Sequence, residues 1–448
     1  MQPSVKPPSS ASNALQQLAL EMVDYARQKG ASDSAIEVSE ALGKTVNVRQ
    51  GKVETIEYNR DKGLSVSVYL GQKRGNASTS DFSTRSMRDT VDAALNIARF
   101  TAEDNCAGLP DAHALSTGTC NLDLYHPWQI SVEQAIQLAQ ECEQAAFSAD
   151  KRIVNTEGAS VSTHEANFIH ANSLGFVGGF PTSRHSVSCS VIAGKGANMQ
   201  RDYWYSVARN ASEILKVEEI GRIAAERTVR RLKARKLATM QCPVLFEAPV
   251  ATSLLGHFVH AVSGGSLYRK SSFLEGKLGQ KVFSEAVKIE DNPTILRGLG
   301  SSAFDDEGVC TQHRTIVEAG VLGGYFLGSY SARKLGMQTT GNAGGPHNLI
   351  LQSGVLDFAG LVRTMHRGLI VTELLGHGVN PVTGDYSRGA AGFWVENGEI
   401  QYPVEEITIA GNLREMFMNI IEVGYDVQVQ GSRQSGSVLI DGMTIAGG

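Results

Sequence analysis

The side chains best suited to chemistry lie in one short apolar stretch, residues 252–265. His257 and His260 stand three positions apart there, and on a helix this spacing brings both imidazoles within reach of one point. A catalytic zinc site needs a third protein ligand and a general base that activates the bound water. The stretch contains no glutamate, and the nearest one upstream is Glu247. Either a metal-binding pair or two packed histidines would fit this pattern.

Two further groups combine acids with other polar residues. Asp385 and Arg388 enclose a Tyr-Ser pair beside a glycine-rich turn, where they could line a cleft for a peptide carboxylate or form a structural ion pair. Residues 305–308, Asp-Asp-Glu-Gly, could supply oxygen ligands. They lack the alternating spacing of a calcium loop, so an acidic turn is the favoured interpretation. Neither group specifies an activity by itself.

Several common functions find no support in the sequence. It has no G-x-x-x-x-G-K-[ST] phosphate loop and no G-x-S-x-G nucleophile motif. A net charge of −5 without any basic block argues against nucleic-acid or anionic-membrane binding. No segment approaches about eighteen apolar residues, and the first dozen residues lack a signal-peptide core, so we expect a cytoplasmic protein. The six cysteines contain no C-x-x-C pair, which favours reduced thiols.

Hydrophobic periodicity predicts the elements that open the chain. A disordered Pro/Ser-rich tail is expected at residues 1–12, and an amphipathic helix at 13–29. Alternating polar and apolar residues then predict an antiparallel meander of four strands at 35–41, 44–50, 53–59 and 64–70. A capping box formed by Ser131 and Gln134 predicts the start of a later helix.

The middle of the chain returns to strands before a boundary near residue 240. Residues 159–207 alternate as strands do, with turns expected at 172–175 and 178–179, and a charged helix is expected at 211–233. Only 15 of the 47 glycines lie in the first 240 residues, so tight turns between short strands should dominate the remainder. The prediction is an α+β fold in two domains, 13–240 and 241–448.

The C-terminal domain is predicted to be β-rich with a few helices. Two of these helices are expected at 250–263 and 357–367. Asn397 and Gly398 lie between two strand-like segments and predict a hairpin with a type I′ turn. The first of the two helices carries the histidine pair, so it must position any chemistry of that site.

Longer segments resemble the PmbA/TldE family, whose members are partner subunits of TldD peptidases. The resemblance covers nearly the whole chain and is far more specific than any short motif. Its carriers are VETIEYNR (53–60), DKRI (150–153), SRHS (183–186), GGSLYRKS (264–271), SYSARKLG (329–336) and TGDYSRGAAGFWVENG (383–398).

The resemblance implies a cytoplasmic zinc-dependent peptidase system. In it, TldD-type and TldE-type subunits form a heterodimer that acts on unfolded peptides, in peptide-antibiotic maturation and antitoxin turnover. The TldD-type zinc site is a helical H-E-x-x-x-H motif with a cysteine near the C-terminus. On this chain Gly256, His257 and Ala261 take the three motif positions, and Ser435 takes that of the cysteine. The helix is therefore expected to be pseudo-catalytic.

The leading hypothesis is a noncatalytic subunit that binds no metal and pairs with a zinc-bearing TldD-like subunit. Its cleft would hold unfolded peptides, for example by β-augmentation, with His257, His260, Asp385 and Arg388 as candidate lining residues. Homodimers are an open alternative when the partner is absent. One rival hypothesis is an autonomous metallopeptidase that adds a distant residue, such as His347 or His377, to the histidine pair. Another is a peptide-binding scaffold with no peptidase partner.

Overall fold

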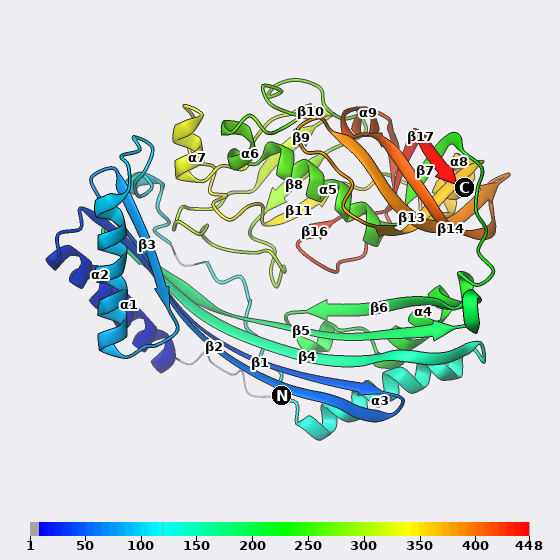
Figure 1. Cartoon of the computed structure of the whole chain (residues 1–448), viewed down its shortest axis with the longest axis horizontal. Helices are drawn as coiled ribbons and strands as arrows, with labels where there is room; N and C mark the ends of the chain where they lie inside the picture. Colours follow the sequence, from blue (N-terminus) through cyan, green and yellow to red (C-terminus); the bar gives the residue numbers. More distant parts are fainter. Residues whose placement is uncertain (1–8, 119, 448) are drawn as a thin grey trace.

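A curved sheet from the first half of the chain lies beneath a β-rich body from the second half (Figure 1). The computed structural model describes residues 9–118 and 120–447. Residues 1–8 of the predicted tail lie outside the described residues, and the first helix begins at Ser9 instead of residue 13. Within the described ranges, no helix is long and apolar enough to cross a membrane.

The N-terminal sheet has six strands in the order β3-β2-β1-β4-β5-β6, and every neighbouring pair is antiparallel. The strands are β1 (Asp33–Arg49), β2 (Lys52–Leu70), β3 (Lys73–Thr79), β4 (Ile153–Asn172), β5 (Val177–Ala193) and β6 (Gln200–Ala208). The helices are α1 (Ser9–Gln28), α2 (Thr84–Phe100), α3 (Val132–Ala149) and α4 (Val217–Arg230).

One face of this sheet carries helices at both of its ends (Figure 1). Ile36 and Val38 near one end of β1, and Val46 and Val48 near the other, are all fully buried. They are separated by even numbers of residues, so they point to the same face. Helices α1 and α2 pack against the first pair, and α3 packs against the second. The opposite face is therefore left toward the C-terminal body.

The predicted four-strand meander is wrong, because β1 and β2 form a single long hairpin. Its turn lies at Gln50 and Gly51, both with positive φ (52° and 69°). The break expected at Gly43 does not occur, since this residue pairs with Asn59 on one side and His164 on the other. Backbone pairing on both sides holds a glycine within a strand despite its low strand propensity.

Other local predictions have mixed outcomes. The capping box at Ser131 and Gln134 is confirmed, and so is the hairpin turn, where Asn397 and Gly398 have φ values of 54° and 73°. The turn expected at 178–179 is wrong, because those glycines lie inside β5, where Gly179 pairs with Ile169. The helix expected at 211–233 is shorter, since α4 begins only at Val217.

The C-terminal body contains a five-stranded barrel and a second sheet. The order β14-β13-β12-β7-β17 closes into the barrel because β14 also pairs with β17, and β15 adds to β17. The second sheet has the order β10-β9-β8-β11-β16. The predicted α+β class with a β-rich C-terminal part is confirmed, but the barrel was not predicted.

The strands of this body are mostly short. They are β7 (Met240–Phe246), β8 (Ile289–Asn292), β9 (Arg314–Glu318), β10 (Val321–Leu322), β11 (Asn348–Leu351), β12 (Gly368–Leu375), β13 (Asp385–Glu396), β14 (Glu399–Asn412), β15 (Ile420–Val423), β16 (Arg433–Gln434) and β17 (Val438–Gly447). The helices are α5 (Ala248–Val262), α6 (Gly264–Tyr268), α7 (Ser329–Lys334), α8 (Phe358–Met365) and α9 (Leu413–Met418).

Helix α5 runs through the middle of the C-terminal body (Figure 1). Its apolar residues recur at helical spacing, and the buried face carries Leu254, Leu255 and Phe258. These side chains join the large core that also holds residues of the barrel and the second sheet. Burial of three large apolar side chains stabilises this position by several kcal/mol, at about 1.5–3 kcal/mol each. The core thus fixes which face of α5 remains available to a site.

Candidate functional site

The available face of α5 forms a narrow polar stripe. Ser253, Gly256, His257 and His260 follow the i, i+3, i+4, i+7 pattern and so line one side of the helix. His260 is exposed, whereas the other three are half-buried. The stripe contains both predicted histidines and the first motif position, so the structure brings these candidate residues together.

His257 lies in an environment that keeps its imidazole neutral. Its ring stands edge-on to that of Tyr386, with 5.9 Å between the ring centroids. Burial, and then repulsion of a second positive charge by Arg388, His260 and Arg433, lower the pKa of His257 to about 4. At neutral pH this imidazole therefore carries no charge, although two guanidinium cations lie near it.

Gly256 allows one of these cations to approach the helix. A Cβ atom at this position would lie 3.0 Å from Nη1 of Arg433, which belongs to β16. A histidine at position 256 would need the space next to this guanidinium. The group beside the first motif position is thus an arginine, which repels a metal ion instead of binding it.

β13 presents alternate side chains to α5. Tyr386 and Arg388 face the helix, and Tyr386 is only 1% exposed. Burial raises the pKa of Tyr386 to about 12, although Arg388 opposes the rise. Asp385 lies on the other face, where it is exposed and accepts hydrogen bonds from Thr383 Oγ1 (2.6 Å) and Asn412 Nδ2 (3.1 Å). Asp385 and Arg388 therefore point to opposite faces of the strand.

The remaining motif positions are enclosed in the interior. Ala261 and Ser435 are both 0% exposed, and the Ser435 hydroxyl donates to the Gly436 carbonyl at 2.7 Å. Neither side chain reaches the polar stripe with a group that binds metal. The residues at these two positions do not fit a zinc ion.

Distant histidines do not complete a metal centre. His347 is buried in the second sheet, where Nδ1 lies 3.2 Å from Oδ2 of Asp291. His377 is exposed on the connection between β12 and β13. Across residues 9–118 and 120–447, no three His, Cys, Asp or Glu side chains are grouped so that they could hold a metal ion.

A small cavity adjoins the N-terminal half of α5. It has a volume of about 280 Å³ and lies between α5 and strands β6, β12 and β13. Ser253 and Arg388 contribute to its wall. The cavity therefore reaches the Ser253 end of the polar stripe and Arg388 of β13.

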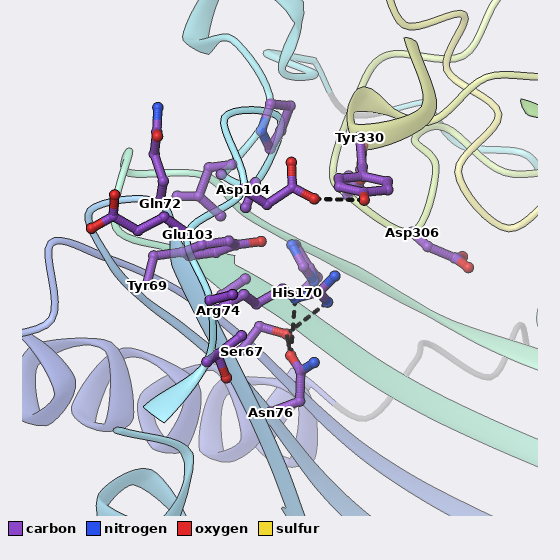
Figure 2. A pocket seen from close by; sticks show the side chains of 18 residues that line it. Ser67, Tyr69, Gln72, Arg74, Asn76, Glu103, Asp104, His170, Asp306 and Tyr330 are labelled. Carbon is purple, nitrogen blue, oxygen red and sulfur yellow. Dashed lines mark hydrogen bonds between the residues drawn. The ribbon is translucent and has the colours of Figure 1, made fainter. Parts of the chain in front are cut away.

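A second cavity was missed by sequence reasoning. It has a volume of about 540 Å³ and lies between the N-terminal sheet and the C-terminal body. Figure 2 shows Arg74 and His170 on the sheet side and Tyr330 across from them, with the Tyr330 hydroxyl donating to Asp104 at 2.8 Å. Burial lowers the pKa of His170 to about 4. Its residues come from distant segments, so no local pattern marked them.

The acidic segment 305–308 borders this cavity. Asp305 accepts hydrogen bonds from the backbone amides of Glu307, Val309 and Ala343, which confirms the predicted acidic turn. Burial nevertheless raises the pKa of Asp305 to about 6. Asp306 also lines the cavity, and its pKa is raised by burial and by Glu307.

Comparisons with known proteins identify the family. Three parts of the chain match the PmbA/TldA metallopeptidase domain 1 (residues 35–98), central domain (125–232) and C-terminal domain (239–447). The chain is 49% identical to metalloprotease PmbA of Escherichia coli O157:H7 over 93% of each chain. It is 46% identical to the PmbA homologue of Haemophilus influenzae, over 95% of this chain and 94% of that one.

The fold agrees with these sequence matches. A crystal structure of a proposed modulator of DNA gyrase from Bacteroides thetaiotaomicron superposes with a TM-score of 0.91, at 27% identity. The superposition covers 96% of this chain and 98% of the other. The chain belongs to the PmbA/TldD metallopeptidase family.

Proposed function

We propose that this chain is the noncatalytic subunit of a TldD/TldE-type zinc metallopeptidase complex that acts on unfolded peptides. The observation that carries the proposal is the contact between Gly256 and Arg433, which puts a cation beside the first position of the degenerate motif. Arg388 adds a second cation near His257. A divalent metal ion would be repelled by both guanidinium groups, more strongly by the half-buried Arg388 than by the exposed Arg433, whose charge water screens.

The proposal assigns zinc to a TldD-like partner subunit and the shaping of a peptide cleft to this one. It also covers the division of the chain into domains 13–240 and 241–448, which is supported by the change of sheet between α4 and β7. A cytoplasmic location is part of it as well, supported by six cysteines that are all free thiols.

The test compares the purified chain alone, a TldD-like subunit alone, and the two mixed. Zinc is measured by atomic absorption, and hydrolysis is followed with a fluorogenic unfolded peptide. We expect negligible zinc and no hydrolysis for this chain alone, and chelator-sensitive hydrolysis with the partner. Stoichiometric zinc and robust hydrolysis by this chain alone would overturn the proposal.

One variant and one co-purification test separate the rival functions. An autonomous metallopeptidase that used His257 and His260 would lose metal and activity on His257→Ala. The proposed subunit should instead keep its fold, and its complex with the partner should keep its zinc and its hydrolysis at saturating peptide. A peptide-binding scaffold would fail to co-purify with any zinc peptidase, whereas the proposed subunit should form a stoichiometric complex with one.

A further inference from the structure

We propose that Arg388 and Arg433, together with Tyr386, His257 and Ser253, form a carboxylate-binding site beside α5. The ligand would be the C-terminal carboxylate of a peptide or an acidic side chain. The peptide nature of the ligand rests on the proposed function, whereas the choice of a carboxylate rests on the charges and hydrogen-bonding groups of the site.

The two arginines of the site carry charges that no described carboxylate neutralises. Among the residues that the structure describes, neither guanidinium forms an ion pair with a carboxylate, whereas Arg227 and Arg231 at the same junction pair with Asp202, Glu247 and Glu373. Arg388 is half-buried, where a cation without a counter-charge is unfavourable, whereas Arg433 is exposed at the edge of the site. An anionic ligand between Arg388 and Arg433 would supply the missing charge.

Four buried polar atoms of this site make no hydrogen bond of good geometry within the described part of the chain: Ser253 Oγ, His257 Nε2, Tyr386 OH and Arg388 Nε. The Arg388 side chain lies close enough to the Tyr386 hydroxyl to oppose the rise in its pKa. Most buried polar groups in proteins are hydrogen-bonded, so four in one place form an unusual cluster. The arginine can only donate, and the two hydroxyls and the imidazole can donate as well. Their shared requirement is an acceptor, which a carboxylate provides.

The adjoining cavity has a volume of about 280 Å³, and Ser253 and Arg388 are the two residues of the site that line it. Its wall also contains Asp202 and Glu373, which are already paired with Arg231. The volume is at the lower limit of small-molecule pockets, which span about 300–1,000 Å³. It suits a chain terminus or one side chain better than a folded segment. A guanidinium is also planar and can bind both oxygens of a carboxylate.

The experiment measures binding of short labelled peptides to the full chain by fluorescence anisotropy. Three probes are used: an alanine pentapeptide with a free C-terminal carboxylate, its C-terminal amide, and an amide that carries glutamate at the central position. We expect the free acid, the glutamate amide or both to bind at least about tenfold more tightly than the alanine amide, as charge-assisted hydrogen bonds allow. A preference for the free acid identifies a peptide terminus, and a preference for the glutamate amide identifies an acidic side chain.

Matched variants locate the binding. Arg388→Gln and Arg433→Gln should each weaken binding of the preferred peptide about tenfold. The control is Arg85→Gln, which removes the same charge from an exposed position on α2 and should leave binding unchanged. Circular dichroism confirms that each variant is folded, and Arg433→Lys provides a second, milder change. Equal binding of all three peptides, or unchanged binding by both arginine variants, would overturn the site. Because no partner is present, this result is independent of the hydrolysis test.

Discussion

Two pairs of arginines flank α5, and only one pair is neutralised. Arg227 donates to both oxygens of Glu247, each at 2.9 Å, and lies 3.4 Å from Asp202. Arg231 pairs with Glu373 and Asp202. Burial alone would lower the pKa of Arg227, but Glu247 and Asp202 raise it above its ordinary value.

The second pair, Arg388 and Arg433, lies near His257, and Arg388 lines the same cavity as Arg227 and Arg231. For these two, no carboxylate of the described residues lies within salt-bridge distance. The placement of carboxylates, and not the number of arginines, therefore separates the structural junction from the proposed binding surface. The paired arginines join α4 and β6 to the start of α5, and the unpaired ones are available to a ligand.

The largest loss of stability is expected when an arginine of the neutralised pair is removed. Arg227→Met leaves Glu247 and Asp202 without their main cation, and breaking such a buried pair costs about 3–5 kcal/mol. We therefore expect a large loss in the free energy of unfolding, measured by urea denaturation. The fluorescence of Trp204 gives a local signal, since the Arg227 guanidinium lies 5.1 Å from its ring centroid.

The matched change in the pair without counter-charges is Arg388→Met. Removal of a cation that has no counter-charge should leave the free energy of unfolding unchanged or raise it. A loss as large as that of Arg227→Met would show that Arg388 is a structural residue, and the contrast between the two pairs would be wrong.

An intermediate loss of stability is expected for a large side chain at position 256, beside Arg433. Gly256→His would force Arg433 to move, and overpacking of this kind costs about 1–3 kcal/mol. Arg433→Ser in the same chain should recover most of the loss. Urea denaturation of the two single variants and the double variant gives the interaction energy between the sites.

Gly256→Ala is the smaller control for this contact. It adds one Cβ atom next to the flexible end of Arg433 and gains about 1 kcal/mol of helix propensity, so it should be neutral or stabilising. If the losses of Gly256→His and Arg433→Ser simply add, the guanidinium does not occupy the space at position 256.

The smallest effect concerns pH. The pKa of His257 is about 4 in the folded chain, below its ordinary value of 6.5. As the pH falls from 6.5 toward 4, the unfolded chain takes up a proton on this residue before the folded chain does, so stability decreases. Above pH 6.5 His257 is neutral in both the folded and the unfolded chain, so its titration no longer changes the free energy of unfolding. His257→Gln should therefore flatten the pH dependence of the urea midpoint in this window.

The exposed neighbour provides the control for this prediction. His260→Gln should leave the slope close to that of the unchanged chain, because His260 is exposed on the same stripe. NMR titration of the His257 ring near pH 6.5, in place of about 4, would contradict the buried and cationic surroundings assigned to it.

Much of the local structure follows from neighbouring residues. The apolar spacing in 250–263 predicts the helix that is α5, and Asn397-Gly398 predicts a turn that needs two positive φ angles. Periodicity fails where backbone pairing overrides propensity. Gly43 predicts a break between two strands, yet pairing with strands on both sides holds it inside β1.

The candidate site was only partly predictable. The histidine pair and Arg388 were found from their residue types, and strand alternation would have shown that Asp385 and Arg388 face opposite sides had they been assigned to a strand. Arg433 could not be predicted as a site residue, because nothing near it in the sequence indicates that β16 passes beside α5. The acidic cavity around His170 was missed for the same reason.

Three features follow from local spacing and residue identity along the chain: the α+β class, the helix that carries the degenerate motif and the resemblance to the family. The surroundings of that helix depend on the tertiary fold. The barrel brings Tyr386 and Arg388 to one side of α5, and the second sheet brings Arg433 to Gly256. Charge acts through space, so the character of the site depends on residues that are distant in sequence.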